Sequence, residues 1–265
     1  AAAAGPKAAA RVAAHLEACF DPDSGCIDFD ALFPPAPPQD LQLASAGRGG
    51  APFARTARGA PVKMELASGH GEWAAAQARE DPAARWVCVE LRHDRVAATA
   101  ARMHLQGLAN LAAVGPVDAG RLLGKFVAPG SVDEVFVNHP EPPERTGEFA
   151  GQGAHLLTDA FFAKVARALK PKGTCTIVTD NMAYALALAR SVAARDDLGS
   201  ARLLRRGPHY QDLHETVGGV KVWVGQPGAE CGHVKRASSF FDRMWTKGQK
   251  TKRFTLFLEN QAQES

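Results

Sequence analysis

The sequence predicts an α/β fold with a doubly wound, mostly parallel sheet that finishes in an antiparallel C-terminal edge. Between residues 62 and 179, five short apolar or β-branched runs alternate with helical segments, the pattern of parallel strands joined by right-handed crossovers. After residue 219 the pattern changes to period-two alternation, which is typical of antiparallel strands. The chain has 265 residues, 46% hydrophobic and 22% charged, so it can bury the large core that such a sheet needs.

The strand candidates are short runs that polar or glycine-containing segments end. The five in the first part of the chain are Val62–Ala67, Trp86–Leu91, Leu111–Val114, Val132–Asn138 and Thr174–Thr179. Two more, Val220–Val224 and Arg253–Glu259, alternate along their length, and the second places Phe254, Leu256 and Leu258 on one face. We expect these two to form an antiparallel pair at the sheet edge.

The helices between the strands are recognised by their ends. Glu72–Glu80 is predicted to be helical after a glycine turn. Asp94 is expected to cap a second helix, which Gly107 ends. Thr158 is expected to cap a third helix, which ends at the Pro-Lys-Gly segment 171–173 before the fifth strand begins.

Residues 1–61 differ in composition from the rest of the chain. They contain an alanine-rich start, a proline cluster at 34–38 and an Ala/Gly/Arg/Pro stretch at 46–61. Such a composition carries too little apolar surface to fold alone, except at His15–Phe33. We therefore expect a low-complexity, partly ordered N-terminal arm at 1–61, which packs locally on a single domain at 62–265.

Charge and cysteine usage bear on partners and compartment. The net charge of +3 permits a polyanionic partner without requiring one. Five cysteines without a C-x-x-C pair indicate a reducing compartment rather than a disulfide scaffold. No apolar run approaches the roughly 20 residues of a membrane-spanning helix, so we expect no membrane partner. We expect a cytoplasmic protein, with an organelle or the nucleus left open.

The segment Glu65–Gly71 (E-L-A-S-G-H-G) follows the first predicted strand and opens the first predicted helix. Gly69 and Gly71 let backbone N–H groups at a helix N-terminus approach a nucleotide closely. Together with Ala74 they also fit the loose dinucleotide fingerprint G-x-G-x-x-A, so an NAD-dependent oxidoreductase is the rival hypothesis. Glu90, near the end of the second strand, suits ribose hydroxyls under either hypothesis.

Three features favour S-adenosylmethionine over a dinucleotide. Glu65 precedes the turn, where a carboxylate suits a cationic sulfonium and amino group and repels a pyrophosphate. Asp118-Ala119 follows the third strand, where an adenine amino group needs an acceptor. The fourth strand runs into the stiff polar turn Asn138–Pro143 (N-H-P-E-P-P), at the carboxyl edge where ligands of α/β sheets bind.

Five blocks of the chain resemble the tRNA (guanine-N7-)-methyltransferase family, over roughly residues 65–259. They are E-L-A-S-G-H-G, W-V-C-V-E-L, H-P-E-P-P, the long block from Leu156 to Tyr184, and S-F-F-D-R at 239–243. The resemblance implies a Rossmann-like class I methyltransferase fold, S-adenosylmethionine as the cofactor and a guanine of the tRNA variable loop as the acceptor. Some members of this family work with a second, non-catalytic subunit, which is the further partner that the resemblance implies.

The residue patterns and the resemblance together assign two sets of site residues. The cofactor is expected at Glu65, Gly69, Gly71, Glu90, Asp118, Ala119 and Glu141. The resemblance alone implies that Arg145, Asp180, Ser239 and Asp242 face the guanosine-bearing substrate. Glu141 and Asp180 are the candidate catalytic residues, in the role of positioning the guanine through hydrogen bonds from its amino edge. No metal is expected, since the spacings of the C-terminal histidines and cysteine (His209, His214, Cys231, His233) match no common zinc ligand pair well.

Several positions depart from the family pattern. Ala67 replaces the first glycine of the loop, which a Cβ permits if the backbone there stays at negative φ. Glu141 replaces an aspartate, Pro143 a tryptophan, and the basic run that follows is reduced to Arg145. Two alternatives therefore stay open: a methyltransferase of this fold that acts on another substrate, and a non-catalytic module that binds cofactor or RNA. Basic residues with aromatic neighbours at 235–253 suit RNA, or protect an edge strand from aggregation.

Overall fold

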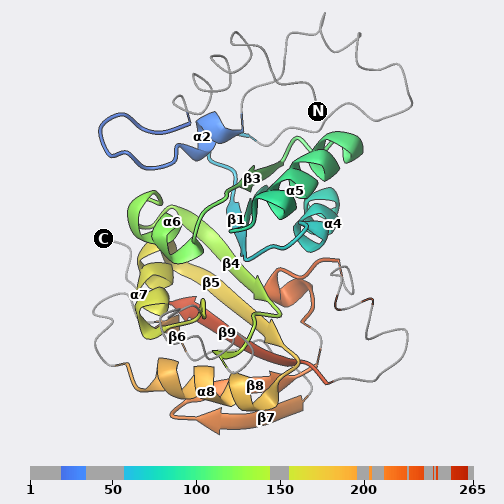
Figure 1. Ribbon diagram of the computed structural model, residues 1–265. Helices are drawn as coiled ribbons and strands as arrows, with labels where there is room; N and C mark the ends of the chain where they lie inside the picture. Colours follow the sequence, from blue (N-terminus) through green and yellow to red (C-terminus); the bar gives the residue numbers. More distant parts are fainter. Residues whose placement is uncertain are drawn as a thin grey trace, which may run out of the picture.

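The computed structural model of the chain describes residues 19–33, 57–143, 155–195, 203–204, 212–225, 227–235, 241, 243 and 252–261. At its centre is a nine-stranded sheet with the order β3-β2-β1-β4-β5-β9-β8-β7, and β6 pairs with β9 (Figure 1). The strands are β1 (Val62–Leu66), β2 (Arg85–Val89), β3 (Leu111–Val114), β4 (Val132–Asn138), β5 (Leu169–Thr179), β6 (Leu203–Leu204), β7 (Asp212–Val217), β8 (Val220–Val224) and β9 (Phe254–Asn260).

Helices cover both faces of the sheet (Figure 1). In the described part of the chain they are α2 (Phe29–Leu32), α4 (Glu72–Glu80), α5 (His93–Gln106), α6 (Ala119–Lys125), α7 (Asp159–Ala168), α8 (Met182–Ala193) and the 3₁₀ turn η2 (Ala229–Cys231). Side chains of β2 alternate between two cores: Trp86 and Cys88 pack with α4, whereas Val87 and Val89 pack with α6, α7 and α8. Among the helices described here, none is both long and apolar enough to cross a membrane.

The sheet confirms the predicted fold class. β1 to β5 are parallel in the order β3-β2-β1-β4-β5, so the sheet is doubly wound about β1 and β4. The antiparallel edge is also confirmed, because β9 pairs antiparallel with both β5 and β8. As the alternation predicts, Phe254, Leu256 and Leu258 are all buried.

Two strands, β6 and β7, lie outside the predicted set. β7 is an exposed edge strand with mostly polar residues, so it lacks the apolar alternation that marks the other strands. It forms a hairpin with β8 through Gly218-Gly219, and both glycines have positive φ, as a two-residue hairpin turn requires. The Gly-Gly pair before Val220 is therefore the sequence signal for β7.

Two predicted element boundaries are wrong. α5 begins at His93 with Arg92 as its N-cap, and Asp94 instead forms an ion pair with the Arg92 guanidinium at 2.8 Å. β5 begins at Leu169, so the segment 171–173 lies within the strand rather than before it. The pairing of β4 with β5 shifts register there, which accommodates the extra residues as a local irregularity.

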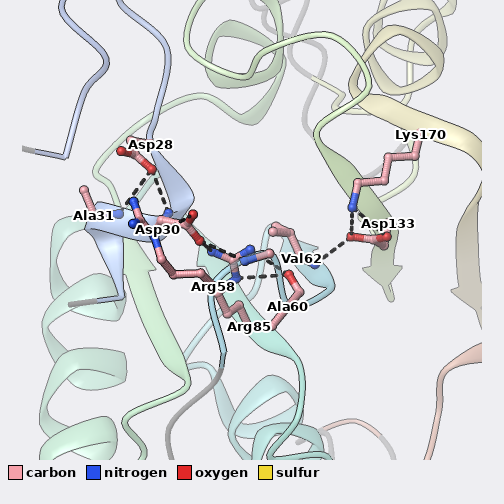
Figure 2. A network of polar contacts seen from close by, with 10 residues as sticks. Asp28, Asp30, Ala31, Arg58, Ala60, Val62, Arg85, Asp133 and Lys170 are labelled. Atoms are coloured by element: carbon pink, nitrogen blue, oxygen red, sulfur yellow. Dashed lines mark hydrogen bonds and ion pairs between the residues drawn. The ribbon is translucent and has the colours of Figure 1, made fainter. Parts of the chain in front are cut away.

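Residues 19–33 pack against the amino edge of the sheet, at the end opposite to the carboxyl termini of β1 to β5. The Arg85 guanidinium at the start of β2 bonds the Asp30 carboxylate and the Ala60 carbonyl (Figure 2). At the start of β1, the Val62 N–H donates to Asp133 at 2.8 Å, and Lys170 pairs with the same carboxylate (Figure 2). Ile27 and Phe29 join the larger core. The domain boundary at residue 62 stays a prediction.

Candidate functional site

The carboxyl ends of five neighbouring strands meet at one edge of the sheet, and predicted site residues follow each of them. In sheet order they are Asp118 and Ala119 after β3, Glu90 after β2, Gly69 and Gly71 after β1, Glu141 after β4 and Asp180 after β5, with Glu65 inside β1. The topology therefore brings these residues to a single edge, which is where open α/β sheets bind ligands. Arg145, Ser239 and Asp242 lie outside the described residues.

The loop after β1 turns sharply because three of its residues adopt left-handed backbone conformations. The φ angles are 54° at Ala67, 58° at Gly69 and 66° at Gly71. Gly71 is the N-cap of α4, and a Cβ there would lie 2.5 Å from Cγ2 of Thr99, so both conformation and space require glycine. At Gly69, by contrast, no described atom lies within 4 Å of a built Cβ, so this backbone is open to a ligand.

Ala67 departs from the expectation for this loop. The expectation that an alanine is accommodated here at negative φ is wrong, because the backbone of Ala67 is left-handed. The residue is exposed, and its left-handed backbone carries a local strain of about 1–2 kcal/mol.

Glu65 is a buried carboxyl at the centre of this edge. Its Oε1 accepts a hydrogen bond from Nδ2 of Asn138 at 3.0 Å, and its Oε2 accepts one from the Ala74 N–H at 3.2 Å. Burial raises the pKa of Glu65 to about 8, the nearby Glu90 charge adds to the rise, and the two hydrogen bonds offset only part of it. The edge thus holds a carboxyl that is mostly protonated at neutral pH and whose ionised form a nearby positive charge would favour.

Glu90 ties the end of β2 to the glycine loop. Its Oε2 accepts from the Gly69 N–H at 2.8 Å and lies 3.8 Å from Nη1 of Arg95. Its Oε1 accepts from the N–H groups of Leu91 and Arg92 at 2.8 and 2.9 Å. Because a carboxylate oxygen has about two acceptor directions, Oε2 keeps one for a further donor such as a hydroxyl.

The loop after β3 is fixed to Glu90 by backbone contacts. The Val117 N–H donates to the Glu90 carbonyl at 3.1 Å, and a Cβ on Gly115 would lie 2.2 Å from that same carbonyl. Asp118 caps α6 through Oδ1, which accepts from the Arg121 N–H at 2.7 Å, and Ala119 behind it is buried. Oδ1 of Asp118 therefore serves as a helix cap, and the residue is exposed at the strand end.

The turn after β4 lies beside the end of β5. The His139 N–H donates to the Val178 carbonyl at 2.7 Å, and His139 has a φ of 54°. Glu141 is exposed, while Asp180, just past the end of β5, is half-buried. Glu141 and Asp180 thus follow neighbouring strands.

The segment 227–235, which is not among the predicted site residues, packs on the face of the sheet beside α4. His233 packs on the rings of Trp73 and Phe136, with centroids 4.7 and 5.4 Å away, and burial lowers the pKa of His233 to about 3. Gln77 holds the end of the segment through two hydrogen bonds with the Lys235 backbone, at 2.7 and 2.8 Å. No spacing in the sequence signals these contacts, because they join residues 158 positions apart.

The described residues form no zinc site around the C-terminal histidines and cysteine. His214, Cys231 and His233 are described, and His209 is not. Within the described ranges, no three His, Cys, Asp or Glu residues gather closely enough to hold a metal ion.

Comparisons with known proteins match the chain to a methyltransferase family. A family described as "Putative methyltransferase" matches residues 59–206, more than half of the chain. The chain is 28% identical over 191 residues to a tRNA (guanine-N(7)-)-methyltransferase of Chlamydia muridarum, covering 72% of this chain and 73% of that protein. It is 33% identical over 126 residues to the protein of the same name from Chlamydia felis, covering 48% of this chain and 54% of that one. It is 32% identical over 190 residues to an Arthrobacter protein so named, covering 67% and 57%.

The chain therefore spans about half the length of the Chlamydia felis and Arthrobacter relatives and about three quarters of the Chlamydia muridarum one. Among solved structures, one titled as an antibiotic related methyltransferase is similar, with a TM-score of 0.47 and 14% identity, covering 74% of this chain and 87% of that chain.

Proposed function

The chain belongs to the methyltransferase family that matches residues 59–206, and from this premise we propose that it transfers a methyl group from S-adenosylmethionine to N7 of a guanine in tRNA. The observation that carries the proposal is the buried Glu65 carboxyl beside the open backbone of Gly69, at the carboxyl edge of a parallel sheet. The names of the relatives support tRNA as the substrate.

The residues at this edge fit S-adenosylmethionine. Glu65 has the raised pKa of a buried carboxyl whose negative charge lacks full compensation, and a sulfonium or ammonium group supplies that compensation. Gly69 leaves room for close approach, and Oε2 of Glu90 has an acceptor direction for a ribose hydroxyl. The exposed Asp118 follows the neighbouring strand, where it can accept a hydrogen bond from the adenine amino group. A dinucleotide fits less well, because its pyrophosphate brings negative charge and supplies no cation to compensate the Glu65 carboxyl.

Methyl transfer to guanine N7 requires the protein mainly to orient the two reactants. The N7 atom of guanine carries a free lone pair, so no general base is needed to make it a nucleophile. When bound, S-adenosylmethionine supplies a methyl group on an activated sulfonium. The residues of the edge then contribute mainly by holding the reacting atoms in line and excluding water, the entropic part of catalysis.

Glu141 and Asp180 are the residues that we assign to guanine positioning. They follow neighbouring strands at the same edge, and carboxylates there accept hydrogen bonds from the amino edge of the base and favour the cation that forms on N7. We also propose that the substrate contacts Arg145, Ser239 and Asp242, three residues that the structure does not describe. A second, non-catalytic subunit is a further proposed partner, on the family resemblance alone.

The experiment that tests the proposal is incubation of bulk tRNA with a labelled methyl donor, followed by nucleoside analysis. The expected product is 7-methylguanosine in the wild-type reaction and none above background with Glu90→Ala, which loses the acceptor for three backbone N–H groups and a ribose hydroxyl. Circular dichroism spectra of the two proteins check that the variant is folded. Label in a different nucleoside would redirect the substrate assignment, and no label in any nucleoside would favour a non-catalytic binding module.

A further inference from the structure

An aromatic pair lies beside the proposed acceptor site. Phe241 contacts the ring of His139, with centroids 5.4 Å apart and planes tilted by 49°. His139 directly follows Asn138, whose amide bonds the Glu65 carboxyl, so the pair stands next to the buried centre of the edge. The Phe241 side chain is 40% exposed even though it rests on His139. A phenylalanine with a purely anchoring role would be buried instead.

Contacts along α4 fix where Phe241 stands. Near the C-terminal end of the helix, Lys235 is held by Gln77 through its backbone and by Glu80 through an ion pair at 3.1 Å. At the N-terminal end, the Arg243 guanidinium pairs with Glu72, the residue that follows Gly71. Lys235 and Arg243 therefore lie against opposite ends of α4, and Arg243 is at the end that adjoins the glycine loop. The contact of Phe241 with His139 and that of Arg243 with Glu72 place Phe241 at the carboxyl edge, beside the turn after β4.

We propose that Phe241, supported by His139, is the stacking surface for the purine that accepts the methyl group. The inference rests on the proposed function and names the residue that holds the base. Bases taken out of a nucleic-acid stack are commonly held on aromatic side chains, which bind any purine face without reading its edge. The acidic residues Glu141 and Asp180 then read the edge of the base.

Stacking on Phe241 also favours the reaction itself. Methylation at N7 converts a neutral guanine into a cation whose charge is spread over the ring. An aromatic face attracts a cation through its quadrupole more strongly than it attracts the neutral base. An interaction that is stronger with the developing cation than with the substrate accelerates the methyl transfer. Phe241 is therefore expected to affect kcat as well as KM for tRNA.

The test compares Phe241→Leu and Phe241→Trp with wild type in tRNA methylation. The matched control is Phe20→Leu, which removes an aromatic ring of similar exposure (38%) beside Phe126 at the far end of α6. Phe241→Leu is expected to lower kcat/KM for tRNA by about tenfold or more while leaving the affinity for S-adenosylhomocysteine unchanged. Phe241→Trp is expected to retain activity, and Phe20→Leu to match wild type. Wild-type kcat/KM in Phe241→Leu, or an equal loss in Phe241→Trp, would overturn the proposal.

Two further measurements distinguish stacking from a structural role of Phe241, and the stacking proposal from the proposed function. Phenylalanine analogues with one, two or three ring fluorines at position 241 keep its shape while weakening the quadrupole, so kcat is expected to fall with each added fluorine. Equal kcat values across the series would overturn the cation-stabilising role. NMR titration with 7-methylguanosine monophosphate and with guanosine monophosphate needs no turnover. If wild type makes no 7-methylguanosine in tRNA, the proposed function fails. The stacking assignment is then decided by whether Phe241→Leu abolishes a preference for the methylated nucleotide.

Discussion

Replacing Glu65 by glutamine tests whether an uncompensated carboxyl is built into the carboxyl edge of the sheet. Burial raises the pKa of Glu65 from 4.5 to about 8. A group whose folded pKa lies above its unfolded pKa contributes stability that is full below the unfolded value and is lost as the pH rises through the folded value. At about 1.4 kcal/mol for each pH unit of difference, wild type loses at most about 5 kcal/mol from this group over that range. Glutamine has no proton to lose, so the variant escapes this loss.

The assay is the free energy of unfolding from denaturant titrations at about pH 6 and about pH 9. Over this interval wild type is expected to lose about 2–3 kcal/mol more than Glu65→Gln, which follows from a folded pKa of about 8. Glu230→Gln, which changes an exposed carboxyl, is the matched control and is expected to follow wild type. A difference between wild type and Glu65→Gln that stays constant between the two pH values would refute the reasoning.

Three further predictions concern the same loop. Binding of S-adenosylmethionine near neutral pH is expected to release up to one proton, because a cationic ligand lowers the raised pKa of Glu65. Calorimetry in buffers of different ionisation enthalpy detects this release. Release of the proton on binding to Glu65→Gln as well would contradict the assignment. Ala67→Gly is expected to raise the free energy of unfolding by up to about 1 kcal/mol, because relief of the left-handed backbone exceeds the added chain entropy; a loss of stability in denaturant titration would argue against it. Gly71→Ala is expected to cost about 3 kcal/mol, since its Cβ would lie 2.5 Å from Thr99. Thr99→Ala in that background is expected to recover part of this loss, and a double variant no more stable than Gly71→Ala would show that the contact is not the cause.

The sequence predicts the parallel half of the sheet because its strands are buried on both faces. β3 and β4 have the predicted bounds, and β1 and β2 differ by one or two residues at their ends. The β7–β8 hairpin is the opposite case. β7 lies at the exposed edge, where no apolar pattern is needed, and its only local signal is the Gly218-Gly219 turn.

Some site residues, like some strands, can be predicted from the sequence, and others cannot. Glu90 and Asp118 come shortly after successive parallel strands. Because such strands bring their carboxyl ends to one edge of the sheet, the location of these residues can be predicted from the order of strands in the sequence. The Glu65–Asn138 hydrogen bond and the hydrogen bonds between Gln77 and the Lys235 backbone join residues far apart in the chain, so no local pattern encodes them. Ala67 shows a further limit, because tertiary constraints on the loop impose a left-handed backbone that its own propensity disfavours.

Calorimetric titration with S-adenosylhomocysteine and with NAD tests most directly that the edge around Glu65 and Gly69 is a methyl-donor site. The expected result is binding of S-adenosylhomocysteine to the wild-type protein, loss of that binding in Glu90→Ala, and no heat from NAD. Because Glu90 bonds the Gly69 N–H, its loss removes both the ribose acceptor and the support of the loop. Binding of NAD without binding of S-adenosylhomocysteine would contradict the assignment.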